Sequence, residues 1–161
     1  MNEQHIQTVL FKYLLDKGHS FIAPNCKALG YEADLLSVLA SGHCYEYEIK
    51  VTRADFAADA AKRTKHDTYS RAGNMREGNR AKHAPARFYY VVPDGLVQPA
   101  EVPVQYGLMY VLCNGDVQIV RQAGWLHHEM LGFDGYRRIA NSLMWKVFKG
   151  VTKQQEMVRT R

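Results

Sequence analysis

The sequence predicts an α/β domain in which helices flank one mixed β-sheet. Apolar residues recur at helical spacing near both ends of the chain, over residues 2–17 and 134–149. Two runs rich in aromatic and β-branched residues, YEADLLSV and CYEYEIKV, predict a β-hairpin. The continuous apolar run RFYYVV, residues 87–92, is typical of a central strand. Helices at both ends and in the middle of such a chain should cover a single sheet.

The first half of the chain predicts a helix, a short connection, the hairpin and a second helix. The first helix should occupy residues 2–17, and residues 19–23 predict either a short strand or an irregular segment. Residues 24–30 are rich in turn formers and predict a loop that leads into the hairpin. Thr52 is a good N-cap for the second helix, which is expected to run to about His66.

The second half alternates loops with strands. Residues 70–86 have little apolar content, two glycines and a proline, and they predict a long loop. The central strand should end at the turn PDG, and two prolines predict a connecting loop over residues 97–105. A second hairpin, with strands at 108–112 and 117–121, is expected across Asn114-Gly115.

The chain is organised as one domain with a short tail. Its 161 residues and 47% hydrophobic content suit a single globular domain over residues 1–150, followed by a basic C-terminal tail at 151–161 that frays. No apolar run approaches the length of a membrane span, and the N-terminus lacks the shape of a signal peptide. We therefore expect a cytoplasmic location without a membrane partner. The three cysteines stand singly, which argues against a zinc ribbon or a disulfide framework.

The positive charge is concentrated in one internal segment and in the tail. The net charge is +5, yet residues 62–87 alone hold eight Lys and Arg against two acids. Residues 146–161 hold five Lys and Arg against one acid. Such segments in an otherwise acidic chain favour a polyanionic partner, with phosphate contacts as the source of affinity. The alternative is a solvated loop and a solvated tail, for which such charge is common.

Charged side chains interrupt the otherwise apolar first hairpin. Because side chains alternate along a strand, Glu32 and Asp34 should share one face, and so should Glu48 and Lys50. Charges among apolar residues need partners or a metal. Two carboxylates and the backbone carbonyl of Ile49 would form an oxygen-rich site that suits Mg²⁺, with Mn²⁺ as a substitute. The alternative is an ion-paired, exposed face of an antiparallel sheet.

The order of these residues resembles the active-site signature of the PD-(D/E)XK nuclease superfamily. Asp34 is followed after thirteen residues by Glu48, and Lys50 completes an E-x-K motif. The proline that often precedes the first acid is replaced by Ala33. The continuation EIKVTRADFAAD, the pair Lys65-His66 with a tyrosine three residues later, and the run RFYYVVPDGL agree with small phage and bacterial nuclease-like proteins, including the MmcB-type DNA-repair group.

The resemblance implies a restriction-endonuclease-like fold and a Mg²⁺-dependent deoxyribonuclease. In that interpretation Asp34 and Glu48 are catalytic and bind the metal together with the Ile49 carbonyl, and Lys50 positions the attacking water. Members of this superfamily often carry an acid on the first helix, so Glu3 is a candidate for an additional metal ligand. Its alternative role is a first-turn acid favoured by the helix dipole.

The expected substrate is DNA, in a setting of DNA repair or phage DNA processing. In the resembled superfamily the helix after the E-x-K strand flanks the active site, which makes Arg53 and Lys65 candidate phosphate contacts. The alternative for each is ordinary charge on a helix surface. The basic segment adds three more candidates, Arg76, Arg80 and Lys82. Two alternatives remain open at this point: a catalytically silent DNA-binding module of the same fold, and an RNA-cleaving relative. The sequence gives no indication of oligomeric state.

Overall fold

A computed structural model of the chain describes the backbone of residues 1–159 and the side chains of residues 1–150. Its centre is a six-stranded sheet in which the strands lie side by side in sequence order. Strand β4 pairs in parallel with β3 and β5, and the other neighbouring strands are antiparallel. The strands are β1 (Phe21–Cys26), β2 (Ala33–Val38), β3 (Cys44–Ile49), β4 (Arg87–Pro93), β5 (Gly107–Val111) and β6 (Val117–Arg121). The predicted α/β class with a mixed sheet is confirmed.

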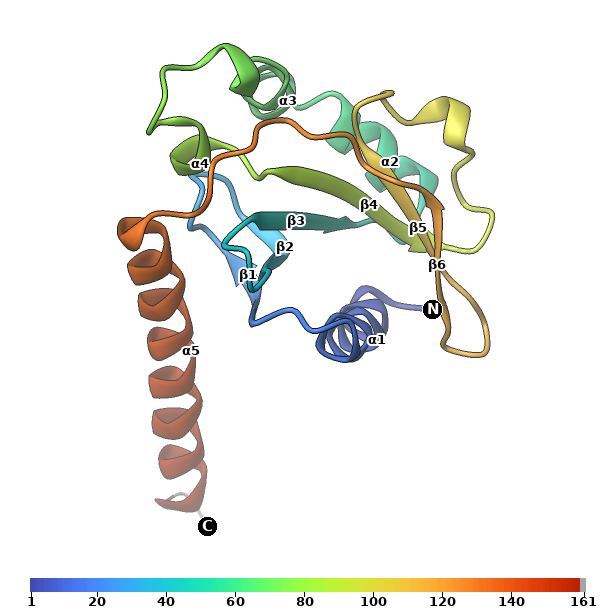
Figure 1. Cartoon of the computed structure of the whole chain (residues 1–161). Coiled ribbons are helices and arrows are strands. Elements are labelled where there is room, and N and C mark those ends of the chain that lie inside the picture. Colours follow the sequence, from blue (N-terminus) through green and yellow to red (C-terminus); the bar gives the residue numbers. More distant parts are fainter. Residues whose placement is uncertain (160–161) are drawn as a thin grey trace.

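Helices cover both faces of the sheet (Figure 1). They are α1 (Glu3–Asp16) on one face, and α2 (Arg53–Ala60), α3 (Arg63–Ser70) and α4 (Arg80–His83) on the other. Because side chains alternate along a strand, Tyr47 and Tyr89 pack in the core under α1. Phe88 and Tyr90 pack in the core under α2 and α3. The even-numbered residues of β3 therefore face α2 and α3.

Helix α1 and the second hairpin follow the sequence pattern. The side chain of Asn2 accepts a hydrogen bond from the backbone N–H of His5, 2.8 Å away, and so caps α1. Ile6, Leu10 and Leu14 are its buried residues, as their helical spacing predicts. The hairpin of β5 and β6 turns at Gly115, whose φ of 87° favours glycine.

Two loops and one helix differ from the sequence-based expectation. Pro24 and Cys26, expected in a loop, extend β1 and pair with Leu35 and Ala33. The missing N–H of proline is tolerated there because β1 lies at the edge of the sheet. Residues 70–86 form helical turns, namely the 3₁₀ helix η1 (Ala72–Asn74) and α4, instead of a long loop. Small apolar side chains that become buried, Ala72, Ala81 and Ala84, explain this order. The connection after β4 also contains a 3₁₀ helix, η2 (Pro99–Glu101).

The helix predicted from Thr52 to about His66 is broken into α2 and α3. The backbone N–H of Lys62 bonds to the carbonyl of Asp59, and that of Arg63 bonds to the carbonyl of Ala61. These short-range bonds replace the regular helical pattern and end α2. The chain then starts α3 in a new direction. This break decides which side chains of α3 are buried against the sheet.

Helix α5 (Phe133–Arg159) extends beyond the predicted end at residue 149. Its first turns pack on β1, where the rings of Tyr136 and Phe21 lie 5.5 Å apart. Lys146 donates hydrogen bonds to the carbonyls of Pro24 and Asn25. The rest of α5 projects from the body of the domain (Figure 1). The side chains of the predicted basic tail, 151–161, lie outside the described residues. In the described part of the chain, no helix is both long and apolar enough to cross a bilayer.

Candidate active site

Asp34 and Glu48 come together at one end of the β2–β3 hairpin. Leu35 pairs with Tyr47 across the two strands, so the next residues, Asp34 and Glu48, face each other on the same side of the sheet. The carboxylate of Asp34 also reaches the backbone, because its Oδ2 accepts a hydrogen bond of 2.7 Å from the N–H of Ile49. The first hairpin therefore positions both acids by local strand geometry alone.

The environment of Asp34 disfavours its ionised form. Burial, and then the negative charge of Glu48, raise the pKa of Asp34 from 3.8 to about 6. The N–H of Ile49 and the ammonium of Lys50 act in the opposite direction but do not cancel these effects. Glu3 adds a smaller unfavourable charge. A group with this pKa, placed at the wall of a pocket, is the kind of acid found at functional sites.

Lys50 lies between two carboxylates. Its Nζ is 2.7 Å from Glu48 Oε1 and 3.7 Å from Asp59 Oδ1. Burial acts to lower the pKa of Lys50, but Glu48, Asp59 and Asp34 outweigh it, so the pKa is raised. The side chain is therefore an ammonium group at neutral pH. In that state it can donate hydrogen bonds and attract anions, but it cannot coordinate a metal.

Lys65 is buried between α3 and the sheet, where it forms ion pairs with two acids of β3. Its Nζ lies 2.8 Å from Glu48 Oε2 and 2.8 Å from Glu46 Oε1, and only 4% of its side chain is exposed. The contact with Glu46 is an ion pair without hydrogen-bond alignment. The hydroxyl of Tyr69 donates to the other oxygen of Glu46 at 2.7 Å. These positions correct the expectation that Lys65 is a surface contact for phosphate, since its charge is already neutralised inside the protein.

Asp59 is a further acid at this site that the sequence did not single out. Its Oδ1 accepts from Lys62 at 2.8 Å, and its Oδ2 accepts from the hydroxyl of Tyr90 at 2.8 Å. Burial tends to raise the pKa of Asp59, but the hydrogen bonds from His66 and Lys62 and the nearby Lys50 lower it overall. The available signal was its spacing, because Asp59 lies three residues after Phe56 on the buried side of α2.

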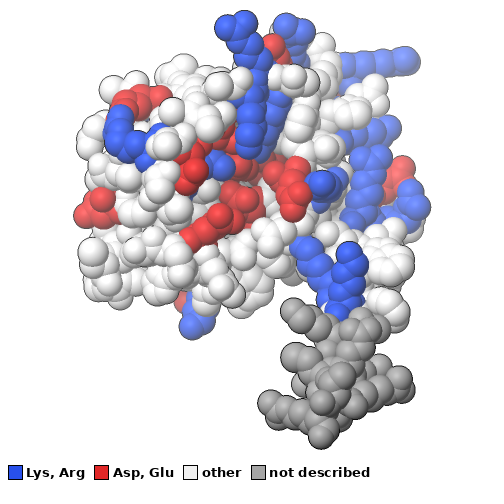
Figure 2. Space-filling model, turned by 180° about the vertical axis from the view of Figure 1, so that it is seen from behind, with Lys and Arg blue, Asp and Glu red and all other residues white. Residues whose placement is uncertain are grey.

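A pocket of about 270 Å³ opens beside these groups. Glu3, Asp34, Lys50 and Asp59 line it, together with the Ile49 region at the end of β3. Glu3 is itself exposed, at the first turn of α1. The pocket thus joins three of the four predicted metal-binding positions with the predicted catalytic lysine. In the space-filling view, acidic side chains gather near the middle of one face and basic side chains border them (Figure 2).

The remaining predicted DNA contacts differ in whether their side chains already have partners within the protein. Arg53 forms an ion pair with Glu101 and donates to the carbonyl of Leu96 at 2.8 Å. Arg80 donates to the carbonyl of Met75 and lies 3.6 Å from a carboxylate oxygen of Glu129. Two further candidates, Arg76 and Lys82, are exposed. Arg53 is exposed as well, but of these candidates only Arg76 and Lys82 are exposed and have no ion pair with an acid of the described residues.

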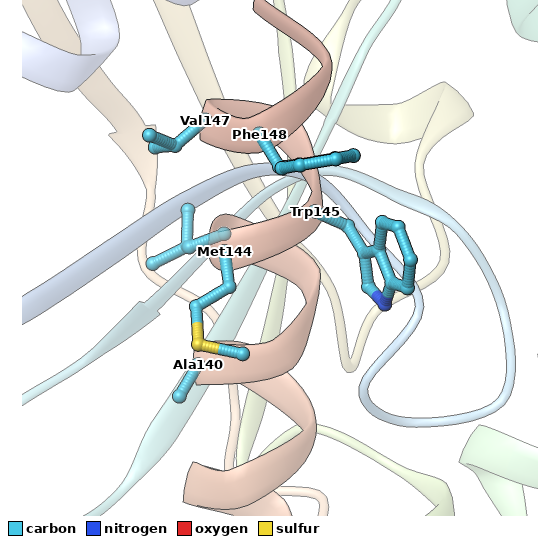
Figure 3. A pocket seen from close by; sticks show the side chains of 6 residues that line it. Ala140, Met144, Trp145, Val147 and Phe148 are labelled. Atoms are coloured by element: carbon cyan, nitrogen blue, oxygen red, sulfur yellow. The ribbon is translucent and has the colours of Figure 1, made fainter. Parts of the chain in front are cut away.

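A larger hollow, of about 730 Å³, lies elsewhere, along helix α5 (Figure 3). Its lining is apolar and includes Met144, Trp145 and Val147, which are 63%, 61% and 67% exposed. It contains none of the acids or lysines described above. The chemistry of the molecule is therefore expected at the smaller, polar pocket.

The donors at the polar pocket fit Mg²⁺ or Mn²⁺. They are carboxylate and carbonyl oxygens, which hard divalent cations prefer. A cation would also remove the cost of ionising Asp34 among other acids. Glu48 does not line this pocket, and a lysine bonds to each of its oxygens, so it could join only by sharing an oxygen with Lys50 or Lys65. Within the described residues, no three or more His, Cys, Asp or Glu side chains already converge as a metal site.

Comparisons with known proteins give the fold and no more. The chain is similar in structure to SPO1766, a protein of unknown function from Silicibacter pomeroyi. The TM-score is 0.56 at 21% sequence identity, over 83% of this chain and 80% of the other. No family model and no curated protein matches the sequence. The resemblance to the PD-(D/E)XK superfamily therefore remains a prediction that rests on the residues themselves.

Proposed function

We propose that this chain is a cytoplasmic, metal-dependent nuclease that hydrolyses phosphodiester bonds of DNA with Mg²⁺. The observation that supports it best is the meeting of Asp34, Glu48 and Lys50 at one end of the sheet. There, Lys50 Nζ lies 2.7 Å from Glu48 Oε1, beside a pocket whose lining holds four acids and one further lysine, Lys62. Two carboxylates with a lysine two residues beyond the second acid are what the D…E-x-K signature requires.

Each residue has a defined task in this proposal. Asp34, Glu48 and the Ile49 carbonyl would hold the metal, with Glu3 as an additional ligand. When bound, Mg²⁺ would offset the charge of the scissile phosphate and polarise it. The ammonium of Lys50 would stabilise the negative charge that develops on the phosphate in the transition state. Asp59 and Glu48 keep that ammonium protonated and in place.

Cleavage of supercoiled plasmid and of short DNA duplexes, with Mg²⁺, Mn²⁺ or EDTA, tests the proposal. Lys50→Ala should lower the single-turnover rate on the order of 100-fold, the effect of removing one charge-stabilising donor. It should leave Mn²⁺ affinity and duplex binding intact, because Lys50 is not a ligand. Asp34→Asn should lose Mn²⁺ affinity as well as cleavage. Lys12→Ala, a change of an exposed lysine on α1, is the matched control.

Two other outcomes would redirect the assignment. Salt-dependent duplex binding without cleavage under any metal would indicate a catalytically silent DNA-binding module. The structure offers a reason for that outcome, since lysines already occupy both oxygens of Glu48. Preferential cleavage of matched RNA substrates would indicate the RNA-cleaving alternative. A Lys50→Ala protein that cuts at the parent rate would refute the assignment of the catalytic lysine.

A further inference from the structure

A second polar pocket lies on the opposite face of the sheet, under the C-terminal half of α1. Its volume is about 280 Å³, near the lower end of the range of roughly 300–1,000 Å³ for small-molecule sites. Four tyrosines from α1, β3 and β4 form much of its wall, with one lysine, one histidine and one glutamine. These residues are Tyr13, Tyr45, Tyr47, Tyr89, Lys17, His19 and Gln122. No member of the proposed nuclease site contributes to this pocket.

One of the two buried tyrosines of this pocket has a hydroxyl group without a protein partner. Tyr89 is 3% exposed, and its ring stacks on Tyr47 at 5.5 Å with an angle of 16° between the planes. No hydrogen bond joins its hydroxyl to any residue in the described part of the chain. The hydroxyl is not one of the buried side-chain atoms left without a hydrogen bond in this part of the chain, so it remains accessible to water. Tyr89 lines the pocket, so a ligand there could replace that water and pair with the hydroxyl.

The sequence also makes room for this ring. A Cβ atom on Gly107 of β5 would lie 2.2 Å from a ring carbon of Tyr89. Glycine inside a strand is unfavourable and often marks the close approach of another group. Gly107 therefore leaves the space in which the Tyr89 ring stacks on Tyr47. Burial raises the pKa of Tyr13 and Tyr45, and Tyr89 adds to it, so these hydroxyls remain protonated donors at neutral pH.

The surroundings of the pocket are basic. Lys17 lies at its edge, with Nζ 5.5 Å from the centre of the Tyr13 ring. The guanidinium of Arg87 lies 5.7 Å from the centre of the Tyr45 ring, and its Nε is buried without a hydrogen-bond partner among the described residues. No acid lines the pocket. A cationic ligand, which aromatic walls alone could attract, is therefore disfavoured, and an anionic group is favoured.

We propose that this pocket binds a single nucleobase whose attached phosphate is held by Lys17 at the pocket edge. The half-buried rings of Tyr13 and Tyr45 offer surfaces for stacking, and the tyrosine hydroxyls offer donors to ring nitrogens and carbonyls. The volume, near the lower end for small-molecule sites, favours a ligand part as small as one base. The base can belong to a free mononucleotide or to an unpaired position of a single strand. Trp125, 39% exposed and stacked under Arg87 at 4.3 Å, extends the aromatic surface in the second case.

Binding to the intact chain in EDTA tests this site separately from cleavage. The probes are the four deoxynucleoside 5′-monophosphates, deoxyribose 5-phosphate without a base, and a single-stranded hexanucleotide, measured by calorimetry and by ligand-observed NMR. We expect the monophosphates to bind and the baseless sugar phosphate to bind at least about tenfold more weakly, because it cannot stack. Tighter binding of the hexanucleotide would assign the base to a single strand, and equal or weaker binding would assign it to a free nucleotide.

Three variants locate the binding. Tyr89→Phe removes only the unpaired hydroxyl and should weaken base binding about three- to tenfold, the effect of one hydrogen bond. Lys17→Gln should weaken the monophosphates and leave the corresponding nucleosides unchanged. Asp34→Asn, at the other pocket, should leave this binding at the parent level even if it abolishes cleavage. Failure of every probe to bind at millimolar concentration, equal binding of the baseless sugar phosphate, or a Tyr89→Phe protein with parent affinity would overturn the proposal.

Discussion

Replacing Asp34 with asparagine should stabilise the protein at neutral pH. The folded structure holds the pKa of Asp34 at about 6, against 3.8 for an unperturbed aspartate. Ionising it costs about 1.4 kcal/mol more in the folded chain for each pKa unit, or on the order of 3 kcal/mol in all. Asparagine carries no charge, and its amide oxygen can still accept the hydrogen bond from Ile49. The variant should recover about 1–3 kcal/mol, since a buried amide also has a desolvation cost.

The stability gained by Asp34→Asn should increase with pH. Because the pKa of Asp34 is raised in the folded state, this carboxyl group does not lower the stability of the parent protein at pH values below about 4. It loses stability as pH rises from about 4 to 6, where the unfolded chain ionises first. The advantage of Asp34→Asn should therefore be about 2 kcal/mol larger at pH 7.5 than at pH 4.5. No such change is expected for Glu77→Gln, which replaces an exposed acid.

Urea unfolding in EDTA, followed by circular dichroism at both pH values, measures these differences. Addition of Mg²⁺ should then raise the stability of the parent and not that of Asp34→Asn, because only a folded metal site is stabilised by its ligand. A variant that is less stable than the parent at pH 7.5, or one with the same pH profile, would refute the argument that Asp34 is held in an unfavourable charged state.

Further predictions concern the buried charges, the strand glycine and the basic surface. Lys65→Met leaves two buried carboxylates of β3 without their shared cation and should cost about 3–5 kcal/mol in urea unfolding, with partial recovery at acidic pH. A loss below about 1 kcal/mol would contradict the buried network. Gly107→Ala should destabilise by more than 1 kcal/mol because its Cβ would overlap an aromatic ring of β4, whereas Gly132→Ala, in open space, should be nearly neutral. Replacing exposed Arg76 and Lys82 with alanine should reduce the salt dependence of DNA binding by roughly 0.9 in log–log slope for each lost phosphate contact, and an unchanged slope would assign them to solvent.

The sequence alone predicted the part of the candidate site whose residues lie close together along the chain. Asp34, Glu48 and Lys50 lie on one short hairpin, and alternation along strands fixes which of their side chains share a face. By the same alternation Tyr47 and Ile49 lie on the other side of β3, where they pack in the core under α1. The helix over residues 2–17 and the strand over 87–92 were also predictable, because the spacing of apolar residues within one segment is enough to identify it as a helix or a strand.

The misplacement of Lys65 had a different cause. On a continuous helix from Thr52 to about His66, its position among other charged residues indicates an exposed side chain. The break between α2 and α3 turns it toward the sheet, where Glu46 and Glu48 compensate its charge. Nothing local in the sequence marks this break, since it depends on how the two helices pack on β3 and β4.

The sequence by itself determined the class of the fold, the sheet's first hairpin and the three residues of the proposed catalytic motif. These follow from backbone periodicity and from side chains that are neighbours along a strand or across a short turn. Only the tertiary structure decided that Asp59 and Lys65 belong to the same charged network, and that four tyrosines enclose a pocket on the opposite face. Those contacts join residues distant in sequence, and they depend on the parallel register of β3 with β4 and on the packing of α1 and α3 against the sheet. Such contacts are set by the packing of the whole chain, which no local pattern encodes.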